Sequence, residues 1–483
     1  MNKQSTWIVF VLLLGGLVSL LSFKNNKQPN VKADYTVSIA ANQVEGLISP
    51  NLMGFNIVYV HERDAQWQKG EGHIPKLLKP LGTKQLRWPG GTVATFYHWD
   101  KLTGQGWSDI WSPNFNLSKN TDPATYTDLD EYLAITKKLN LDPLVGINMG
   151  SGKKNNRVQD GIDEAKRLMN HCLDKGVRVK YFFLDNEPYH ETANYKFTAE
   201  EYAGQINLYA TEMKKIDPNI KTIVNTHPSN DAYTKTLIKE AGRNIDYVDV
   251  HNYWKFNNAS FASWKAEPKM TQQGRFPYSE QRGHFKKIFQ ELGYPDVELV
   301  ILEWNIGPNV AANNVFPTPA EAALMVSEQF TQYIQEGLHM ACFWPLSWPE
   351  KPRWASRVLL NAQDGYKPNK VYDMFALYTD VMGQQKIKSA ASADRLINVA
   401  AKSKDGKDVW VYLINKNLDK ASLTVDLSLT DFQASGYKAV SFAAADREPD
   451  KLDIKEIKFI KKDASHFSVT MPQFSFVKIT FKK

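Results

Sequence analysis

The chain has 483 residues, of which 43% are hydrophobic and 12% are aromatic, and its formal net charge is +7. A chain of this length and apolar content can bury a large core, which excludes an intrinsically disordered protein and leaves room for one large and one smaller domain. The positive charges are spread along the chain without a block of five or more like charges. The sequence therefore gives no sign of a nucleic-acid-binding surface.

The first 33 residues differ from the rest of the chain. Lys3 precedes the apolar run IVFVLLLGGLVSLLSF at residues 8–23, and a polar stretch follows. A short charged segment before such a run is typical of an export signal. The run is shorter than the about 20 apolar residues of most membrane-spanning helices, so a retained anchor is the alternative. We expect an exported protein that is periplasmic, secreted or anchored in a membrane with its folded domains outside the cytoplasm.

Only two cysteines are present, Cys172 and Cys342, and both lie in apolar segments. Isolated cysteines of this kind are usually small buried hydrophobic residues, and neither has the spacing of a metal ligand. The sequence also lacks a Gly-rich phosphate loop, an HExxH motif and a Cys/His cluster. We therefore expect no cofactor and no metal.

Between residues 48 and 383, short apolar runs alternate with amphipathic helical segments. Two of the helices have clear starts, since Thr198 begins a capping-box spacing and Thr318 is followed by Pro319 at the first helical position. Apolar strands joined by helices form parallel sheets covered on both faces, and eight such units predict a closed (β/α)₈ TIM barrel. The eight predicted strands lie within 51–56, 84–91, 143–151, 179–187, 221–228, 245–254, 297–305 and 340–348.

After residue 383 the pattern changes to alternating apolar and polar residues in short runs separated by turn residues. This pattern predicts an antiparallel β-sandwich domain over residues 384–483. The stretch 34–47, which precedes the barrel, has the same character. We expect it to add a strand to the sandwich.

Two acidic residues end predicted barrel strands. Glu187 follows Asn186 at the end of the fourth strand, and Glu303 ends the seventh. The carboxyl ends of barrel strands form the active site in this fold, so the two side chains should meet at the mouth. Two carboxylates facing each other fit glycoside cleavage, in which one protonates the leaving oxygen and the other attacks the sugar carbon. Either acid alone would be more simply a solvated strand end.

Short motifs around these acids resemble a known group of enzymes. The Asn-Glu pair at 186–187, the His-x-Tyr at 251–253 and the segment LEWN at 302–305 together resemble clan A of the retaining glycoside hydrolases. Within that clan, ISPNLMGFN at 48–56 and LRWPGGTVATFYHWD at 86–100 are most similar to the family 51 α-L-arabinofuranosidases.

The resemblance implies a role for each matching residue. Glu187 would be the general acid/base and Glu303 the nucleophile, while Asn186 would bind the sugar 2-hydroxyl. Arg87 and Tyr253 would support Glu303. The remaining residues predicted to bind substrate or support the site are Asn56, His251, Trp304 and Trp344.

The sequence thus predicts an exported, arabinofuranosidase-like retaining glycoside hydrolase that degrades a plant or algal polysaccharide, or its oligosaccharides, by double displacement. An endo-acting clan A glycanase of the xylanase, glucanase, agarase or carrageenase type is one alternative. A catalytically silent carbohydrate-binding protein is the other. The cations Lys265, Lys269 and Arg275 carry a further hypothesis, that the substrate is sulfated or contains uronate.

Overall fold

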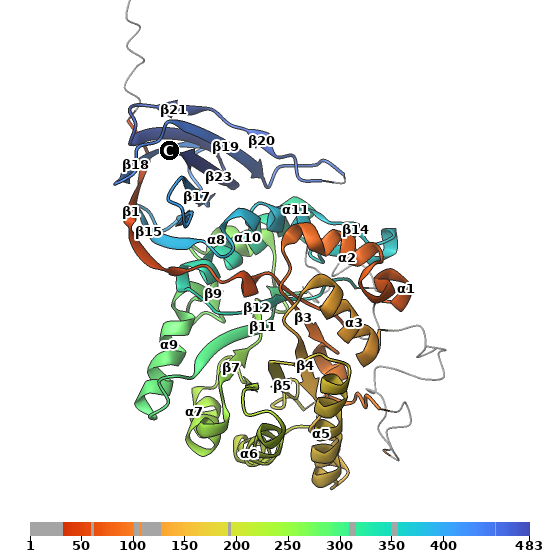
Figure 1. The fold of residues 1–483 in the computed structure, drawn as a ribbon. Coiled ribbons are helices and arrows are strands. Elements are labelled where there is room, and N and C mark those ends of the chain that lie inside the picture. Colours follow the sequence, from red (N-terminus) through yellow and green to blue (C-terminus); the bar gives the residue numbers. More distant parts are fainter. Residues whose placement is uncertain are drawn as a thin grey trace, which may run out of the picture. The chain divides into compact units, whose positions relative to one another are not determined.

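A closed parallel barrel forms the middle of the chain (Figure 1). The structure is a computed structural model that describes residues 32–58, 62–100, 107, 127–191, 195–308, 315–348, 356–449 and 451–483. The apolar segment at residues 8–23 and most of the loop at 104–122 lie outside this set. No helix among the described residues combines the length and the apolar character needed to cross a membrane.

Eight strands pair in parallel around the barrel, and the last of them pairs with the first to close it. Each strand begins inside its predicted run, so the predicted (β/α)₈ barrel is confirmed. A short additional strand, β8 (Asn252–Trp254), follows β7 and pairs with the outer half of β11. The barrel strands are β2 (Gly54–Asn56), β3 (Gln85–Trp88), β4 (Leu144–Ile147), β5 (Tyr181–Leu184), β6 (Lys221–Thr226), β7 (Tyr247–Val250), β11 (Glu298–Ile306) and β12 (Ala341–Phe343).

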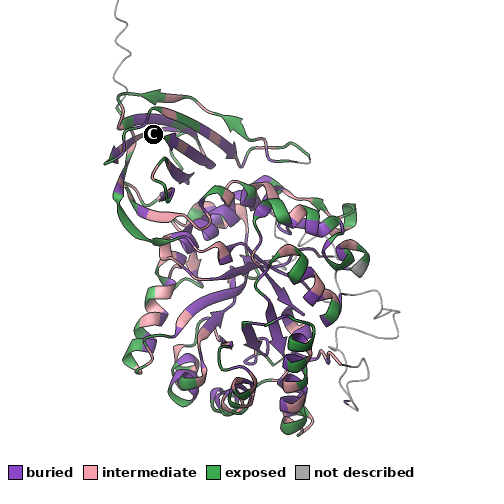
Figure 2. Ribbon diagram, in the orientation of Figure 1, coloured by how far each residue is buried: buried purple, intermediate pink, exposed green. Residues whose placement is uncertain are grey.

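Helices surround these strands, and Figure 2 shows buried strands inside helices whose outer faces are exposed. The capping box predicted at Thr198 is present, a second one forms at Thr318, and Pro319 occupies the first turn of its helix. The helices are α1 (Asp64–Trp67), α2 (His73–Leu78), α3 (Leu129–Leu139), α4 (Gly150–Lys154), α5 (Val158–Asp174), α6 (Ala199–Ile216), α7 (Asp231–Ala241), α8 (Phe261–Ala266), α9 (Tyr278–Glu291), α10 (Pro319–Glu336) and α11 (Lys370–Ala376). Two small hairpins, β9 (Thr271–Gln272) with β10 (Phe276–Pro277) and β13 (Leu360–Asn361) with β14 (Lys367–Pro368), lie in the loops.

Side chains inside the barrel close its lower part. Tyr181 and Phe183 of β5 point inward at alternate positions and pack with Leu144, Leu302 and further apolar residues. Because this layer fills the interior, only the carboxyl ends of the strands can form an open site. Cys342 belongs to the same layer and is a free thiol, as is Cys172.

The remaining strands form one curled ten-stranded sheet, which confirms the predicted C-terminal β-domain. All its pairings are antiparallel except that of β1 with β18. β1 lies between β15 and β18, so residues 35–47 belong to this sheet. Strand β15 was not among the predicted runs because its sequence QKIKSAA buries only Ile387. The strands are β1 (Tyr35–Leu47), β15 (Gln385–Ala391), β16 (Leu396–Lys402), β17 (Asp408–Asn415), β18 (Ser422–Thr430), β19 (Gly436–Ala443), β20 (Lys455–Glu456), β21 (Phe459–Lys461), β22 (His466–Pro472) and β23 (Ser475–Lys482).

Candidate active site

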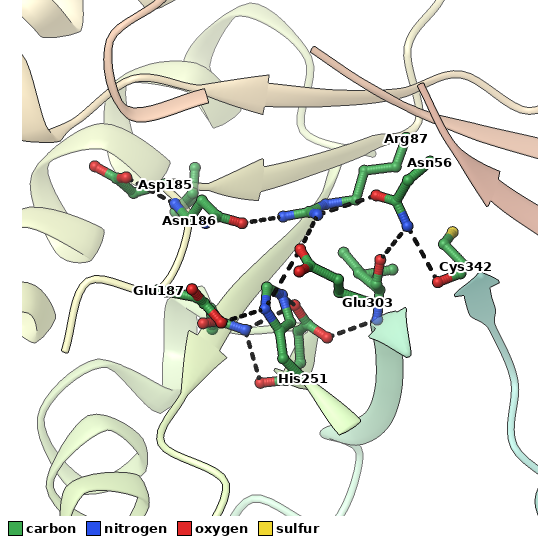
Figure 3. Close-up of polar contacts among 12 residues, drawn as sticks. Asn56, Arg87, Asp185, Asn186, Glu187, His251, Glu303 and Cys342 are labelled. Atoms are coloured by element: carbon green, nitrogen blue, oxygen red, sulfur yellow. Dashed lines mark hydrogen bonds and ion pairs between the residues drawn. The ribbon is translucent and has the colours of Figure 1, made fainter. Parts of the chain in front are cut away.

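Glu187 and Glu303 meet at the carboxyl end of the barrel, on the wall of a cavity of about 430 Å³. One carboxylate oxygen of each residue and a ring nitrogen of His251 lie within 4.8 Å of one another. Figure 3 shows the two glutamates and His251 pointing toward one another from different strands. The structure thus brings together the two acids that the strand ends predicted.

The turn that carries Glu187 has an unusual backbone. Asp185 and Glu187 both have positive φ, 66° and 45°, a conformation that costs energy for residues other than glycine. The Asp185 carboxylate holds this turn: it accepts hydrogen bonds from Thr95 Oγ1 at 2.6 Å, from its neighbour Asn186 N at 2.7 Å and from Met149 N at 3.2 Å. Asp185 is therefore a positioning residue for Glu187, a role that sequence reasoning missed.

Arg87 links the two acidic strand ends. Its guanidinium donates to Glu303 Oε2 at 3.0 Å, to Asn56 Oδ1 at 3.1 Å and to Asn186 Oδ1 at 2.6 Å, and it lies 4.4 Å above the ring of Phe183. Figure 3 shows this arrangement. Because these contacts come from three different strands or strand ends, those of β2, β5 and β11, Arg87 can hold Glu303 in one orientation.

Asn56 is fully buried and does not line the cavity. Its amide nitrogen donates to the backbone carbonyls of Leu302, Cys342 and Phe343 at 2.9–3.2 Å, while its oxygen accepts from Arg87. Its place in the structure is that of a support for Arg87, because three backbone carbonyls hold its amide nitrogen while its oxygen accepts from the guanidinium.

Tyr253 completes the surroundings of Glu303. Its hydroxyl donates to Glu303 Oε1 at 2.5 Å, and Arg87 donates to the other oxygen. Each oxygen of Glu303 thus has its own donor, which stabilises the negative charge and fixes the plane of the carboxylate.

His251 lies among three carboxylates. Its Nδ1 is 2.8 Å from Glu187 Oε1 and 3.5 Å from Glu303 Oε2, and its Nε2 is 3.1 Å from Asp249 Oδ2. Burial lowers the pKa of His251, but the three negative charges outweigh burial and raise that pKa to about 10. The ring is therefore an imidazolium ion at neutral pH. Burial also raises the pKa of Glu187, yet the hydrogen bond and charge of His251 lower it overall.

Asp249 is a second residue that sequence reasoning missed. It is buried on β7, where it accepts hydrogen bonds from Leu302 N at 2.7 Å and from Asn225 Nδ2 at 2.8 Å. A signal was available, since Asp249 is a charged residue in an apolar strand and lies two positions before His251, on the same face.

The tryptophans divide into two groups. Trp304 is 0% exposed and stacks on Phe330 of α10, with ring centroids 5.8 Å apart. Because strand residues alternate, Trp304 points outward where Glu303 points inward, so the prediction that it contacts the sugar is wrong. Trp344 does line the cavity, and its ring covers Gly91, where a Cβ atom would come within 2.5 Å of that ring. The cavity residues that the sequence did not single out as site residues include Tyr189, His190, His227, Phe256, Gln273 and Trp348.

The three cations of the acidic-substrate hypothesis are engaged elsewhere. Arg275 donates to both carboxylate oxygens of Asp231 at 2.8 Å, Lys269 lies 3.7 Å from Asp394, and Lys265 lies over the ring of Phe261. None of the three lines the cavity. The structure therefore gives no support to a sulfate or uronate site built from them.

Glu187, His251 and Glu303 are also a set of side chains that could in principle hold a metal ion. The charges around them disfavour this. The Arg87 guanidinium lies 3.0 Å from Glu303 Oε2, and the protonated ring of His251 faces Glu187. A metal ion there would lie beside the guanidinium charge of Arg87, and His251 would have to lose a proton before it could bind the ion.

Comparison with known proteins finds α-L-arabinofuranosidases that are similar to part of the sequence. No protein-family model matches the chain. The intracellular exo-α-(1→5)-L-arabinofuranosidase 1 of Bacillus subtilis is 22% identical over 202 residues, 38% of each chain. The α-L-arabinofuranosidase C of Emericella nidulans is 27% identical over 167 residues, 31% of each chain. The sequence matches thus span well under half of these relatives.

Solved structures extend the likeness in fold. The α-L-arabinofuranosidase of Thermotoga maritima superposes with a TM-score of 0.74 at 20% identity and covers 93% of this chain and 100% of its own. A bifunctional glucanase-xylanase from a metagenome library gives a TM-score of 0.66 at 15% identity, with 93% and 99% coverage.

The same comparison corrects the expectation of export. Several of the matched relatives are named intracellular arabinofuranosidases. The prediction of an exported protein is wrong on this ground. The resemblance to the clan A glycoside hydrolases, and within them to the family 51 α-L-arabinofuranosidases, is confirmed, in sequence over about a third of the chain and in fold over nearly all of it.

Proposed function

We propose that the protein is a retaining glycoside hydrolase that cleaves α-L-arabinofuranosyl linkages in a poly- or oligosaccharide of plant or algal origin. The distance between the two acids supports this most directly, because an oxygen of Glu187 and one of Glu303 lie within 4.8 Å. Retaining enzymes hold the two carboxyl groups about 5–5.5 Å apart, whereas inverting enzymes need about 6.5–9.5 Å to admit a water molecule. The matched relatives are named α-L-arabinofuranosidases, and the sugar in the proposal is taken from those names.

Glu303 acts as the nucleophile in this proposal. One of its oxygens forms a bond to the anomeric carbon while the bond from that carbon to the leaving oxygen breaks, which gives a glycosyl-enzyme ester. Arg87 and Tyr253 hold both oxygens in place during the attack. Water then attacks the same carbon, the ester bond breaks, and the Glu303 carboxylate is regenerated.

Glu187 supplies and recovers the proton. His251 Nδ1 lies 2.8 Å from Glu187 Oε1, so the protonated ring can pass its proton to Glu187 across this hydrogen bond. A sugar that fills the cavity removes water from Glu187 and so favours its protonated form. Glu187 then gives the proton to the leaving oxygen, and as a carboxylate it accepts a proton from the attacking water in the second step.

Trp344 contacts the sugar in this account, since its ring lies at the cavity wall. Asn186 is buried and is not among the residues that line the cavity, and its side-chain oxygen accepts a hydrogen bond from Arg87, so its part is to support the site. An endo-acting glycanase remains the second candidate, because a glucanase-xylanase is among the proteins of similar fold.

A product screen tests the proposal. The purified chain is incubated with 4-nitrophenyl α-L-arabinofuranoside, arabinan, arabinoxylan, xylan, β-glucans, agar and carrageenan, beside a Glu303→Gln variant. Release of arabinose that is lost in the variant supports the proposal. Release of xylo- or gluco-oligosaccharides would favour the endo-acting glycanase, and silence of a folded protein on every substrate would favour the carbohydrate-binding alternative.

A further inference from the structure

One segment of the chain lines the catalytic cavity at both of its ends. This segment, residues 255–273, follows strand β8 and contains helix α8 and strand β9. Phe256 near its beginning and Gln273 at its end both lie on the cavity wall. Tyr253, which donates to the proposed nucleophile, precedes the segment, and its ring lies edge-on to that of Phe256 with centroids 5.3 Å apart. A group that holds the middle of this segment therefore also holds part of the cavity wall.

The C-terminal sheet contacts the middle of the segment. The ring of Phe261 on α8 lies edge-on to that of Phe474, in the turn between β22 and β23, with centroids 5.5 Å apart. Trp264 on α8 is fully buried, and Lys416 Nζ, from the loop after β17, lies 4.4 Å from the centre of its ring. Helix α8 thus packs against two loops of the sheet.

Arg395 binds the end of α8 by hydrogen bonds. It lies in the turn between β15 and β16, and its guanidinium donates to Lys265 O at 2.8 Å and to Ala266 O at 3.1 Å. These are the last two carbonyls of the helix, which is where a helix lacks partners of its own. The same guanidinium donates to Lys416 O at 3.4 Å. A turn of the sheet therefore fixes the place where α8 ends.

A short chain of contacts connects this end of α8 to the cavity wall. Glu267 directly follows the helix, and its Oε1 lies 2.7 Å from Lys255 Nζ. Its Oε2 accepts from Trp254 Nε1 at 3.2 Å. Trp254 and Lys255 stand between Tyr253 and Phe256 in the sequence. A shift of Glu267 would therefore be passed directly to the part of the wall that Tyr253 and Phe256 form.

We propose that Arg395 is a positioning residue for the catalytic cavity, so that the C-terminal sheet holds one wall of the active site. Arg395 is not among the residues that line the cavity, and it acts through the end of α8 and through Glu267. A wall that is already in place binds a substrate without the cost of being ordered first. The kinetic consequence rests on the proposed function, whereas the effect on the wall does not.

The kinetic test uses an Arg395→Ala variant. Its KM for 4-nitrophenyl α-L-arabinofuranoside should rise about tenfold while kcat stays within about twofold of the wild type, because the wall loosens and the two catalytic acids keep their own contacts. Arg395→Lys, which keeps the charge but has a single nitrogen to offer, should recover part of the loss in KM. A fall in kcat at unchanged KM, which a loss of folded protein would give, overturns the positioning role, and so does an unchanged KM and kcat.

Lys478→Met is the matched control. Lys478 on β23 forms another ion pair between the sheet and the barrel region, at 2.6 Å from Asp380. Neither residue contacts the cavity wall, since neither lines the cavity. The variant should keep the wild-type KM, and a KM raised as much as in Arg395→Ala would mean that any loss between sheet and barrel has the same effect, which contradicts a specific role of Arg395.

Hydrogen exchange separates this inference from the proposed function. In Arg395→Ala the backbone amides at residues 253–258 and 271–275 should exchange about tenfold faster than in the wild type, while those of helix α6 should not change. That result supports the positioning role even if the wild-type chain cleaves none of the sugars. Faster exchange that is confined to α8, or unchanged exchange throughout, contradicts it even if the wild-type chain is an active arabinofuranosidase.

Discussion

Glu303 and Glu328 are both buried carboxylates that receive hydrogen bonds on each oxygen, but their surroundings differ. Glu328 on α10 accepts from Met270 N at 2.6 Å and from Trp264 Nε1 at 2.6 Å, and it pairs with Lys416 at 2.7 Å. Both Glu328 and Lys416 are 0% exposed, and neither lines the catalytic cavity. This pair joins the barrel helix to residue 416, directly after strand β17 of the sheet.

At the mouth of the barrel the charges are not matched. Three carboxylates, those of Glu187, Asp249 and Glu303, share the cations of Arg87 and His251. The surplus negative charge lies on Glu187, which lines the cavity and has a positive φ. Breaking a matched pair sealed in the core destabilises the fold, whereas surplus charge on a cavity wall can take part in proton transfer.

The largest expected effect is on activity. Replacing Glu303 by Gln, or Glu187 by Gln, should lower kcat by about 10⁴-fold, because each removes one of the two groups that the reaction requires. The melting temperature should stay near that of the wild type. A variant that keeps more than a tenth of the wild-type rate would remove that residue from the proposed mechanism.

Glu328→Gln should lower the stability of the fold and leave kcat near the wild-type value. It leaves the buried Lys416 without its counter-ion, so the free energy of unfolding in denaturant should fall by about 3–5 kcal/mol. The double variant Glu328→Gln/Lys416→Met serves as the control, and we expect it to regain a large part of that loss. If Glu328→Gln were as stable as the wild type, the Glu328–Lys416 pair would not hold helix α10 and the segment after strand β17 together.

His251 should make the free energy of unfolding depend on pH. Its pKa rises from 6.5 to about 10 on folding, so its contribution to stability is complete below pH 6.5 and is lost as pH rises through 10. The wild-type free energy of unfolding should therefore decline between pH 7 and pH 10, and it should decline less in His251→Gln. Parallel curves for the two proteins would mean that His251 is neutral in the folded state.

A third buried carboxyl, that of Glu62, sharpens the contrast because its two described hydrogen-bond donors are neutral groups. Glu62 accepts from Ser347 Oγ at 2.6 Å and from Val58 N at 3.2 Å, and burial raises its pKa from 4.5 to about 8. Its folded-state pKa is the higher one, so the folded protein loses stability as pH rises from 4.5 through 8.

Glu62→Gln should accordingly be about as stable as the wild type at pH 5 and more stable at pH 9, by roughly 1 kcal/mol or more. Thermal unfolding at the two pH values measures this difference. A variant that is destabilised equally at both values would show that the carboxyl is ionised throughout.

Sequence alone predicted the barrel because each of its strands is a dense apolar run that ends in polar residues. It also predicted Glu187 and Glu303, since both end such runs. Asn56 was predicted as a site residue, but its hydrogen-bond partners and those of Asp185 and Asp249 were not readable, because they lie in segments that are far apart in the chain. Trp304 was misjudged because a residue next to a catalytic position on a strand points to the opposite face.

The stereochemistry of the first product tests the account most directly. Proton NMR of the reaction with an α-L-arabinofuranoside follows the anomer that appears before mutarotation. The account predicts that the α-anomer appears first, because displacement by Glu303 and then by water inverts the carbon twice. Initial release of the β-anomer would mean a single displacement and would contradict the role of Glu303 as nucleophile.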